Sequence, residues 1–448
     1  MTRCRSADGR HPRGAVAPRP TMAFHGWLAA ILMLPIAAAT AAPELTLQEA
    51  EQQALSADPA ILASRSRAAA LQEQAVADGQ LPDPRLTFGA FNVPTDDFSM
   101  KKEGSSQLRT GIKQAFPRGR SLHYRKKRTE WLGKAEQERT RLTQLEIRRD
   151  VREAFLELFY QNQARNIIDE SRGLFQQLLE ITRAHYASGR VSQQDVLQAQ
   201  LELSRLDDRA TRIDEKADVQ RARLARWIGD AAWQPIQDRF PQLQSPPSRD
   251  QLAAQLPQHP AIRAASDRVE ANQQLVKAAR EQYKPGFDLG VEYRKRFGDN
   301  PDGSNRTDML AAMVTMDLPI FTGKRQDKRL SASRQQTEAA IQAREQKLRE
   351  MRRMLDSDYA RWQRLGEQQR LYHEHLLRES HDNADAALNA YQSGITEFNT
   401  LMRARITELE VRLQDLRVRV DRAKAQARLL FLAADRHTAS PSPKGEKQ

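Results

Sequence analysis

The sequence contains two copies of one unit. The segment DPAILAS at 58–64 returns as HPAIRAAS at 259–266, and YASG at 186–189 returns as YQSG at 391–394. Two related units in one chain pack against each other, so the repeat constrains the fold more than any single motif does. We divide the chain into a leader (1–42), a first copy (43–239), a proline-containing linker (240–250), a second copy (251–436) and a tail expected to be disordered (437–448).

The leader contains the apolar segment WLAAILMLPIAAATAA, which follows basic residues and ends in small ones. This pattern is typical of a secretion signal, and we expect its removal near Ala41 or Ala42. The start codon corresponds either to Met1 or to Met22. The single cysteine, Cys4, precedes the apolar segment. The exported chain is therefore expected to have no disulfide and not to be lipidated.

Charge and hydropathy exclude several functional classes. Lys and Arg number 71 against 58 Asp and Glu, and mean hydropathy is −0.73. Such a chain cannot supply several membrane-spanning helices, and its interspersed charges do not favour nucleic acid as a partner. We find no motif of an enzyme and expect no cofactor or metal. His373, His375 and His381 cannot converge on one ion from a single helix.

Each copy contains two runs in which apolar and polar residues alternate, as in a β-strand. Their length matches a bilayer crossing with lipid on one face and a water-filled lumen on the other. The residues expected to face the lumen are Arg109, Lys113, Asp288, Glu292 and Arg294. The alternative is a small soluble sheet. Four strands leave two open edges, so a membrane barrel would need strands from several subunits.

Long helices follow the strands in both copies. Residues 121–188 contain no proline and would form a helix of about 100 Å. The two short helices that flank it in sequence, 47–80 and 192–228, match its length when stacked end to end. Heptad spacing at 199–227 and 406–430 predicts coiled-coil packing. The predicted fold class is mainly α, with long coiled-coil helices forming a tunnel and four membrane strands per chain.

The order of these elements resembles that of the TolC family of bacterial outer-membrane efflux proteins. The segments that carry the resemblance are LPDPRLTFGAFNVP, IKQAFPRGR, YASGRVSQQDVLQAQLEL and MDLPIFTGKRQ, and they look most like the branch that serves heavy-metal exporters. The resemblance implies a homotrimer in outer-membrane lipid, with a trimeric β-barrel and a periplasmic tunnel. It also implies a passive export channel, served by a periplasmic adaptor and an inner-membrane pump of the resistance-nodulation-division type.

The resemblance further assigns the helix-turn-helix tips to adaptor docking. The tip residues are Gly189, Arg190, Val191, Gly394, Ile395 and Thr396. Asp195 matches an aspartate at the pore aperture of relatives, although Ser192 and Asp195 also form a capping-box pattern. Glu397 is a substitute for the second aspartate that the family pattern expects. Two alternatives remain open: a soluble periplasmic coiled-coil scaffold, and the outer channel of type I protein secretion.

Overall fold

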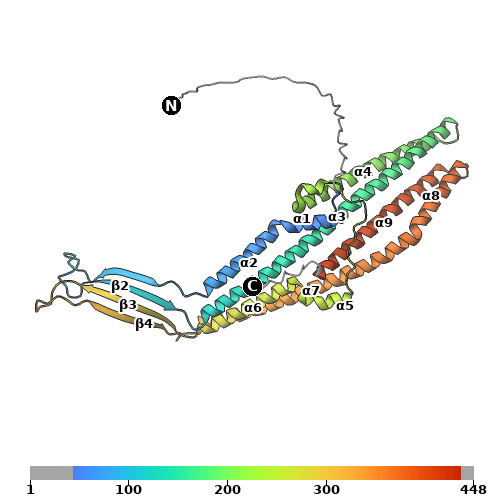
Figure 1. The fold of residues 1–448 in the computed structure, drawn as a ribbon. Helices are drawn as coiled ribbons and strands as arrows, with labels where there is room; N and C mark the ends of the chain where they lie inside the picture. Colours follow the sequence, from blue (N-terminus) through green and yellow to red (C-terminus); the bar gives the residue numbers. More distant parts are fainter. Residues whose placement is uncertain (1–43, 435–448) are drawn as a thin grey trace, which may run out of the picture. The chain divides into compact units, whose positions relative to one another are not determined.

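The computed structural model describes residues 44–434 (Figure 1). The predicted signal peptide (1–42) and disordered tail (437–448) lie outside this part of the chain. The described residues contain two successive sets of helix, two strands and long helices, in the predicted order. Four strands form one sheet, and the helices of both copies run alongside one another (Figure 1).

The helices of the first copy are α1 (Leu47–Ser56), α2 (Pro59–Asp78), α3 (Ser121–Ala187) and α4 (Gln193–Ile228). With 67 residues, α3 is about 100 Å long, as predicted. The prediction of one helix over 47–80 is wrong. Asp58 interrupts it, because its side chain accepts a hydrogen bond from Ala60 N at 2.8 Å and Pro59 then opens a new helix.

The helices of the second copy are α5 (Arg249–Gln255), α6 (Pro260–Glu281), α7 (Gln326–Leu371), α8 (Leu377–Gln392) and α9 (Phe398–Leu432). Since α5 begins at Arg249, the predicted linker ends earlier than expected. His259 caps α6 as Asp58 caps α2, with Nδ1 accepting from Ala261 N at 3.2 Å. One wide π-helical turn, Tyr372–Leu376, separates α7 from α8 within the predicted long helix.

The helix α3 is the centre of the packing, with contacts to α2, α4, α6 and α9. The predicted heptad stripe of α4 is buried at Ala199, Leu206, Ala210, Ile213, Ala217 and Leu224. The stripe of α9 is buried at Leu409, Leu413, Leu416, Val420, Ala423, Ala427 and Leu430. Both heptad predictions are confirmed, and the long helices therefore bury a narrow apolar seam and leave charged faces outside.

Charged side chains also join the two copies. Glu157 on α3 accepts hydrogen bonds from Arg417, at 2.8 Å, and from Lys424, both on α9. Glu153 pairs with Arg428 at 2.9 Å.

None of the helices described within 44–434 has the length and apolar character needed to cross a membrane.

The sheet has the order β1-β2-β3-β4 and is antiparallel throughout. Its strands are β1 (Arg85–Phe91), β2 (Gln107–Phe116), β3 (Gly286–Arg296) and β4 (Met309–Asp317). The β2–β3 pairing joins the two copies. Within the described residues, β1 and β4 each pair with a strand on one side only, which leaves two edges with unpaired backbone groups.

Candidate functional site

The first helical tip is a tight turn between α3 and α4. Gly189 has φ +71°, in the left-handed region that glycine adopts without strain. Gly189 N donates to Tyr186 O and Arg190 N to His185 O, both at 2.9 Å. This bonding satisfies carbonyls at the end of α3 and reverses the chain within a few residues.

Asp195 caps the start of α4. Its Oδ2 accepts from Ser192 N at 3.0 Å and from Ser192 Oγ at 2.9 Å, while Asp195 N donates to Ser192 Oγ at 3.4 Å. The capping box predicted from the sequence is therefore present. Oδ1 takes no part in this capping pattern, so the cap leaves that oxygen free for a second role.

The second tip repeats the turn between α8 and α9. Gly394 has φ +70°, Gly394 N donates to Tyr391 O at 3.0 Å, and Ile395 N donates to Ala390 O at 2.9 Å. Unlike Asp195, Glu397 makes no capping hydrogen bond and is exposed. The two tips thus share a backbone turn and differ in how their acidic residues are held.

The two tips lie side by side and enclose a pocket of about 620 Å³. The predicted tip residues on its wall are Arg190, Val191, Asp195, Gly394, Thr396 and Glu397. Gly189 and Ile395 lie in the turns themselves, and Ile395 is strongly exposed.

The aromatic rings of His185, Tyr391 and Phe398 line this pocket. The Tyr391 side chain is buried, with ring centroids 5.7 Å from His185 and 5.8 Å from Phe398. Burial, with a smaller contribution from the Asp195 carboxylate, raises the pKa of Tyr391. Sequence analysis did not identify His185. The only signal for it was its position next to the repeated tyrosine-glycine turn.

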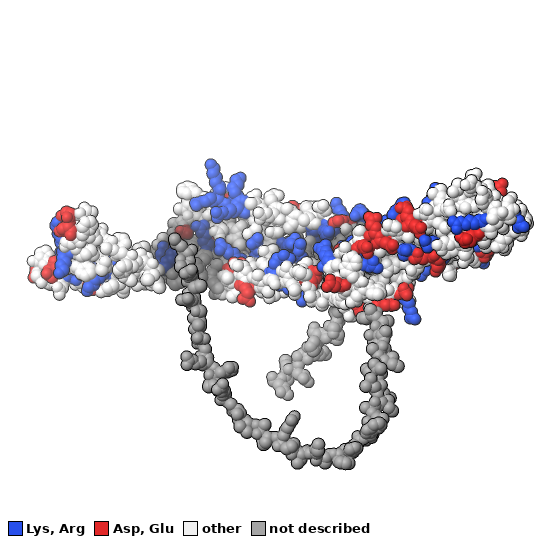
Figure 2. All heavy atoms as spheres, turned by 90° about the horizontal axis from the view of Figure 1, so that it is seen from above, with Lys and Arg blue, Asp and Glu red and all other residues white. Residues whose placement is uncertain are grey.

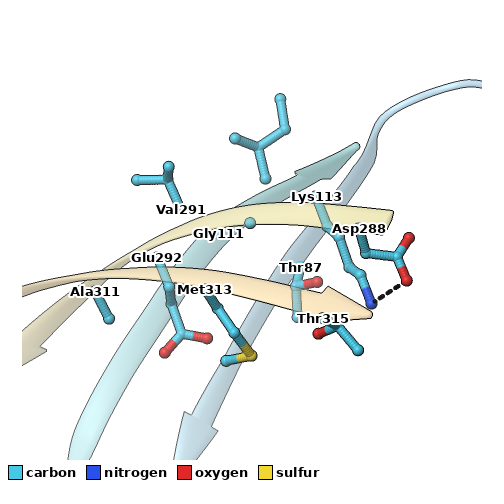
Figure 3. A pocket seen from close by; sticks show the side chains of 11 residues that line it. Thr87, Gly111, Lys113, Asp288, Val291, Glu292, Ala311, Met313 and Thr315 are labelled. Atoms are coloured by element: carbon cyan, nitrogen blue, oxygen red, sulfur yellow. Dashed lines mark ion pairs between the residues drawn. The ribbon is translucent and has the colours of Figure 1, made fainter. Parts of the chain in front are cut away.

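The predicted lumen residues lie together on one face of the sheet. The register pairs Arg109 with Arg294 and places Glu292 and Asp288 on the same side. Lys113 Nζ lies 3.2 Å from Asp288 Oδ2 (Figure 3), and Glu292 Oε1 lies 2.6 Å from Arg294 Nε and 3.8 Å from Arg109 Nε. This charged face also includes Thr87, Met313 and Thr315 (Figure 3).

The opposite face is apolar and exposed. Phe88 is 72% exposed and Leu310 76%, and Ile112, Val291 and Val314 share this face. An exposed apolar surface of this extent is unusual unless lipid or another protein covers it. One side of the sheet therefore suits water and ions, and the other suits a hydrocarbon environment.

Both copies match one protein family. The model described as outer membrane efflux protein matches residues 50–230 and 252–434. The chain belongs to this family. The two matched segments correspond to the two copies, each of which contains one strand pair and one tip. No curated protein matches the chain.

Solved outer-membrane channels share the fold of this outer membrane efflux protein. VceC of Vibrio cholerae is 19% identical with a TM-score of 0.74, over 87% of this chain and 96% of VceC. The open-state MtrE channel of Neisseria gonorrhoeae is 15% identical with a TM-score of 0.70, over 87% and 88%. CusC is 16% identical with a TM-score of 0.71, over 86% and 91%. These likenesses confirm the predicted TolC-like fold.

Proposed function

We propose that this protein is the passive outer-membrane conduit of a tripartite efflux system. The observation that carries the proposal is the two-faced sheet: ion pairs cover one face, and exposed apolar side chains cover the other. A sheet of this kind is stable between lipid and water once its edges are paired. We infer that β1 of one subunit pairs with β4 of the next in a homotrimer, with Arg109, Lys113, Asp288, Glu292 and Arg294 facing the lumen.

The two tips form the proposed docking site for a periplasmic adaptor. Both tips end in the same glycine turn, and their exposed residues include Ile395 and Tyr186. Exposed apolar and aromatic side chains of this kind suit contact with a protein partner. The inner-membrane pump, of the resistance-nodulation-division type, would supply energy, because a passive tunnel has no energy source of its own.

The aperture proposal rests on Asp195 and Glu397. Three copies of each carboxylate around one axis would attract cations and repel one another. Because Asp195 uses only Oδ2 for capping, capping and gating are compatible. We expect Asp195→Asn to reduce block of single-channel current by divalent cations several-fold, with folding unchanged. Asp218→Asn on the same helix is the matched control. Equal block in both variants would contradict this role.

The cargo is proposed to be metal ions or small drugs, with selection made by the pump. A deletion strain exposed to copper, silver, zinc, cobalt, cadmium and common drugs separates these classes, and sensitivity to drugs alone would reject metal export.

Cell fractionation tests where the protein is located. We expect the exported chain in the outer membrane after removal of the signal peptide, and recovery in osmotic-shock supernatant without detergent would contradict the channel.

A further inference from the structure

Two basic segments lie at one end of the sheet. In an antiparallel sheet of order β1-β2-β3-β4, β2 and β4 run in the same direction, so their carboxyl ends lie at the same end of the sheet. The segment RGRSLHYRKKR (118–128) follows β2, and GKRQDKR (323–329) follows β4. The repeat therefore brings both basic segments to the place where the sheet joins the helices. Figure 2 shows Lys and Arg atoms gathered on the part of the helices next to the sheet.

Exposed apolar side chains lie between the sheet and the second basic segment. Phe321 is 82% exposed, and Leu318 and Ile320 are also largely exposed. Apolar and aromatic residues followed by basic ones are typical of protein surfaces at the boundary between acyl chains and headgroups.

Several of the basic side chains form no close ion pair with a carboxylate. Arg118 pairs with Asp317 at 3.6 Å and Lys127 with Glu130 at 2.9 Å. In contrast, Arg125, Arg128 and Arg329 form no ion pair within 4.0 Å in the described part of the chain. The Asp78 carboxylate acts on Arg125 and Arg128 at longer range, and the rest of the positive charge is available to a partner.

These three arginines line one pocket of about 570 Å³ between α3, α6 and α7. Apolar residues of α6, Leu275, Ala278 and Ala279, form part of its wall. The one acidic residue on the wall is Asp78, whose carboxylate accepts a hydrogen bond from Thr129 Oγ1 at 2.6 Å. Three guanidinium groups against one carboxylate leave an excess of positive charge beside an apolar wall.

We propose that this basic pocket, defined by Arg125, Arg128 and Arg329, binds the phosphate headgroup of an anionic phospholipid in the periplasmic leaflet of the outer membrane. Guanidinium groups bind phosphate oxygens in bidentate fashion, and a cluster of basic residues next to a membrane surface concentrates anionic lipid. The exposed Leu318, Ile320 and Phe321 would contact the acyl chains nearby. The inference rests on the proposed outer-membrane placement.

The test uses the full exported chain in nanodiscs of phosphatidylethanolamine with 20% phosphatidylglycerol. Native mass spectrometry after detergent extraction counts the phosphatidylglycerol retained per trimer. The test variant is Arg125→Gln/Arg128→Gln/Arg329→Gln, and Arg→Lys at the same positions keeps the charge. The control, Arg223→Gln/Arg352→Gln/Arg353→Gln, removes three exposed arginines that form no ion pair in 44–434.

We expect the wild type to retain phosphatidylglycerol in preference to phosphatidylethanolamine. The test variant should lose about fivefold in affinity for each arginine removed. The lysine variant keeps the charge but not the bidentate geometry, so it should lose less than the test variant, and the control should keep most of the binding. Because the acyl chains contribute to binding, excess inorganic phosphate should not displace the bound phosphatidylglycerol. Displacement by phosphate would show that the pocket binds free phosphate and would reject lipid as the occupant. Equal retention in test and control variants would overturn the proposal.

Single-channel recording on the same samples separates this proposal from the channel function. If the wild type conducts and shows no lipid preference, only the lipid proposal fails. If it does not insert into the bilayer, the proposed function fails. A changed anion-to-cation permeability ratio in the test variant, with lipid retention unchanged, would place the three arginines in the lumen and overturn the lipid site.

Discussion

The half-buried cluster of Glu157, Arg417 and Lys424 makes a testable link between the two copies. Burial alone would raise the pKa of Glu157, but hydrogen bonds from Arg417 and Lys424 lower it to about 2. Its side chain is only 19% exposed. Replacing it by Gln removes the charge that holds both cations of α9 against α3, so we expect Glu157→Gln to destabilise the fold at neutral pH.

The magnitude follows from the pKa. A fall from 4.5 to about 2 corresponds to about 3 kcal/mol per subunit, at about 1.4 kcal/mol per pKa unit. With unfolding entropy of about 2.1 cal/mol/K per residue over roughly 390 residues, this energy lowers Tm by about 4 °C. Because the folded pKa is lowered, the contribution is present above pH 4.5 and is lost as pH falls towards 2.

The assay is thermal unfolding of the detergent-solubilised protein, followed by helical circular dichroism at pH 7, 4.5 and 3. The control is Glu170→Gln, which removes a second carboxylate of α3 that pairs with α9, at Arg412. Glu170 is 61% exposed, so we expect a loss of less than about 1 kcal/mol. Equal Tm shifts in both variants, or a Glu157→Gln shift that does not shrink at pH 3, would refute the reasoning.

Three other predictions test the fold at separate places. Burial lowers the pKa of His259 to about 4. The stability that the neutral imidazole contributes is therefore present above pH 6.5 and is lost as pH falls towards 4. His259→Gln should reduce this pH dependence in a series of Tm measurements from pH 7.5 to 4.5. Gly394→Ala should lower the free energy of unfolding by about 1 kcal/mol because φ at this position is +70°. Gly173→Ala, inside α3, should raise it by up to about 1 kcal/mol. If urea unfolding gave shifts of the same sign for both variants, this account would be contradicted. Phe155→Ala leaves a cavity at a fully buried site and should lower the free energy of unfolding by about 3–5 kcal/mol. Phe98→Ala, at an exposed site, should lower it by less than about 0.5 kcal/mol in the same assay.

The sequence predicted the elements whose pattern is repeated along the chain. Alternation located the strands to within a few residues, since one face of each strand is mostly apolar. The heptads located the buried stripes of α4 and α9 for the same reason. The residues expected to face the lumen share one face of the sheet because the period of two holds in both copies.

Other features depend on contacts that no local pattern encodes. The breaks before Pro59 and Pro260 are an exception, because each carries a local signal, a capping residue followed by proline. The wide turn at Tyr372–Leu376 has no such signal. The Glu292 pairs with Arg109 and Arg294 require the register between the two copies. The pocket of Arg125, Arg128 and Arg329 requires α3 and α7 to lie on either side of α6.

The central claim is that the charged face of the sheet lines a water-filled pore. Thr315 and Val314 are neighbours on β4 and point to opposite faces. Since the chain has one cysteine, Cys4, it can be removed and a cysteine introduced at either position. In planar bilayers, a charged, membrane-impermeant thiol reagent should reduce the current through Thr315→Cys and leave that through Val314→Cys unchanged. Reaction at Val314→Cys alone, or no current from either variant, would contradict the account.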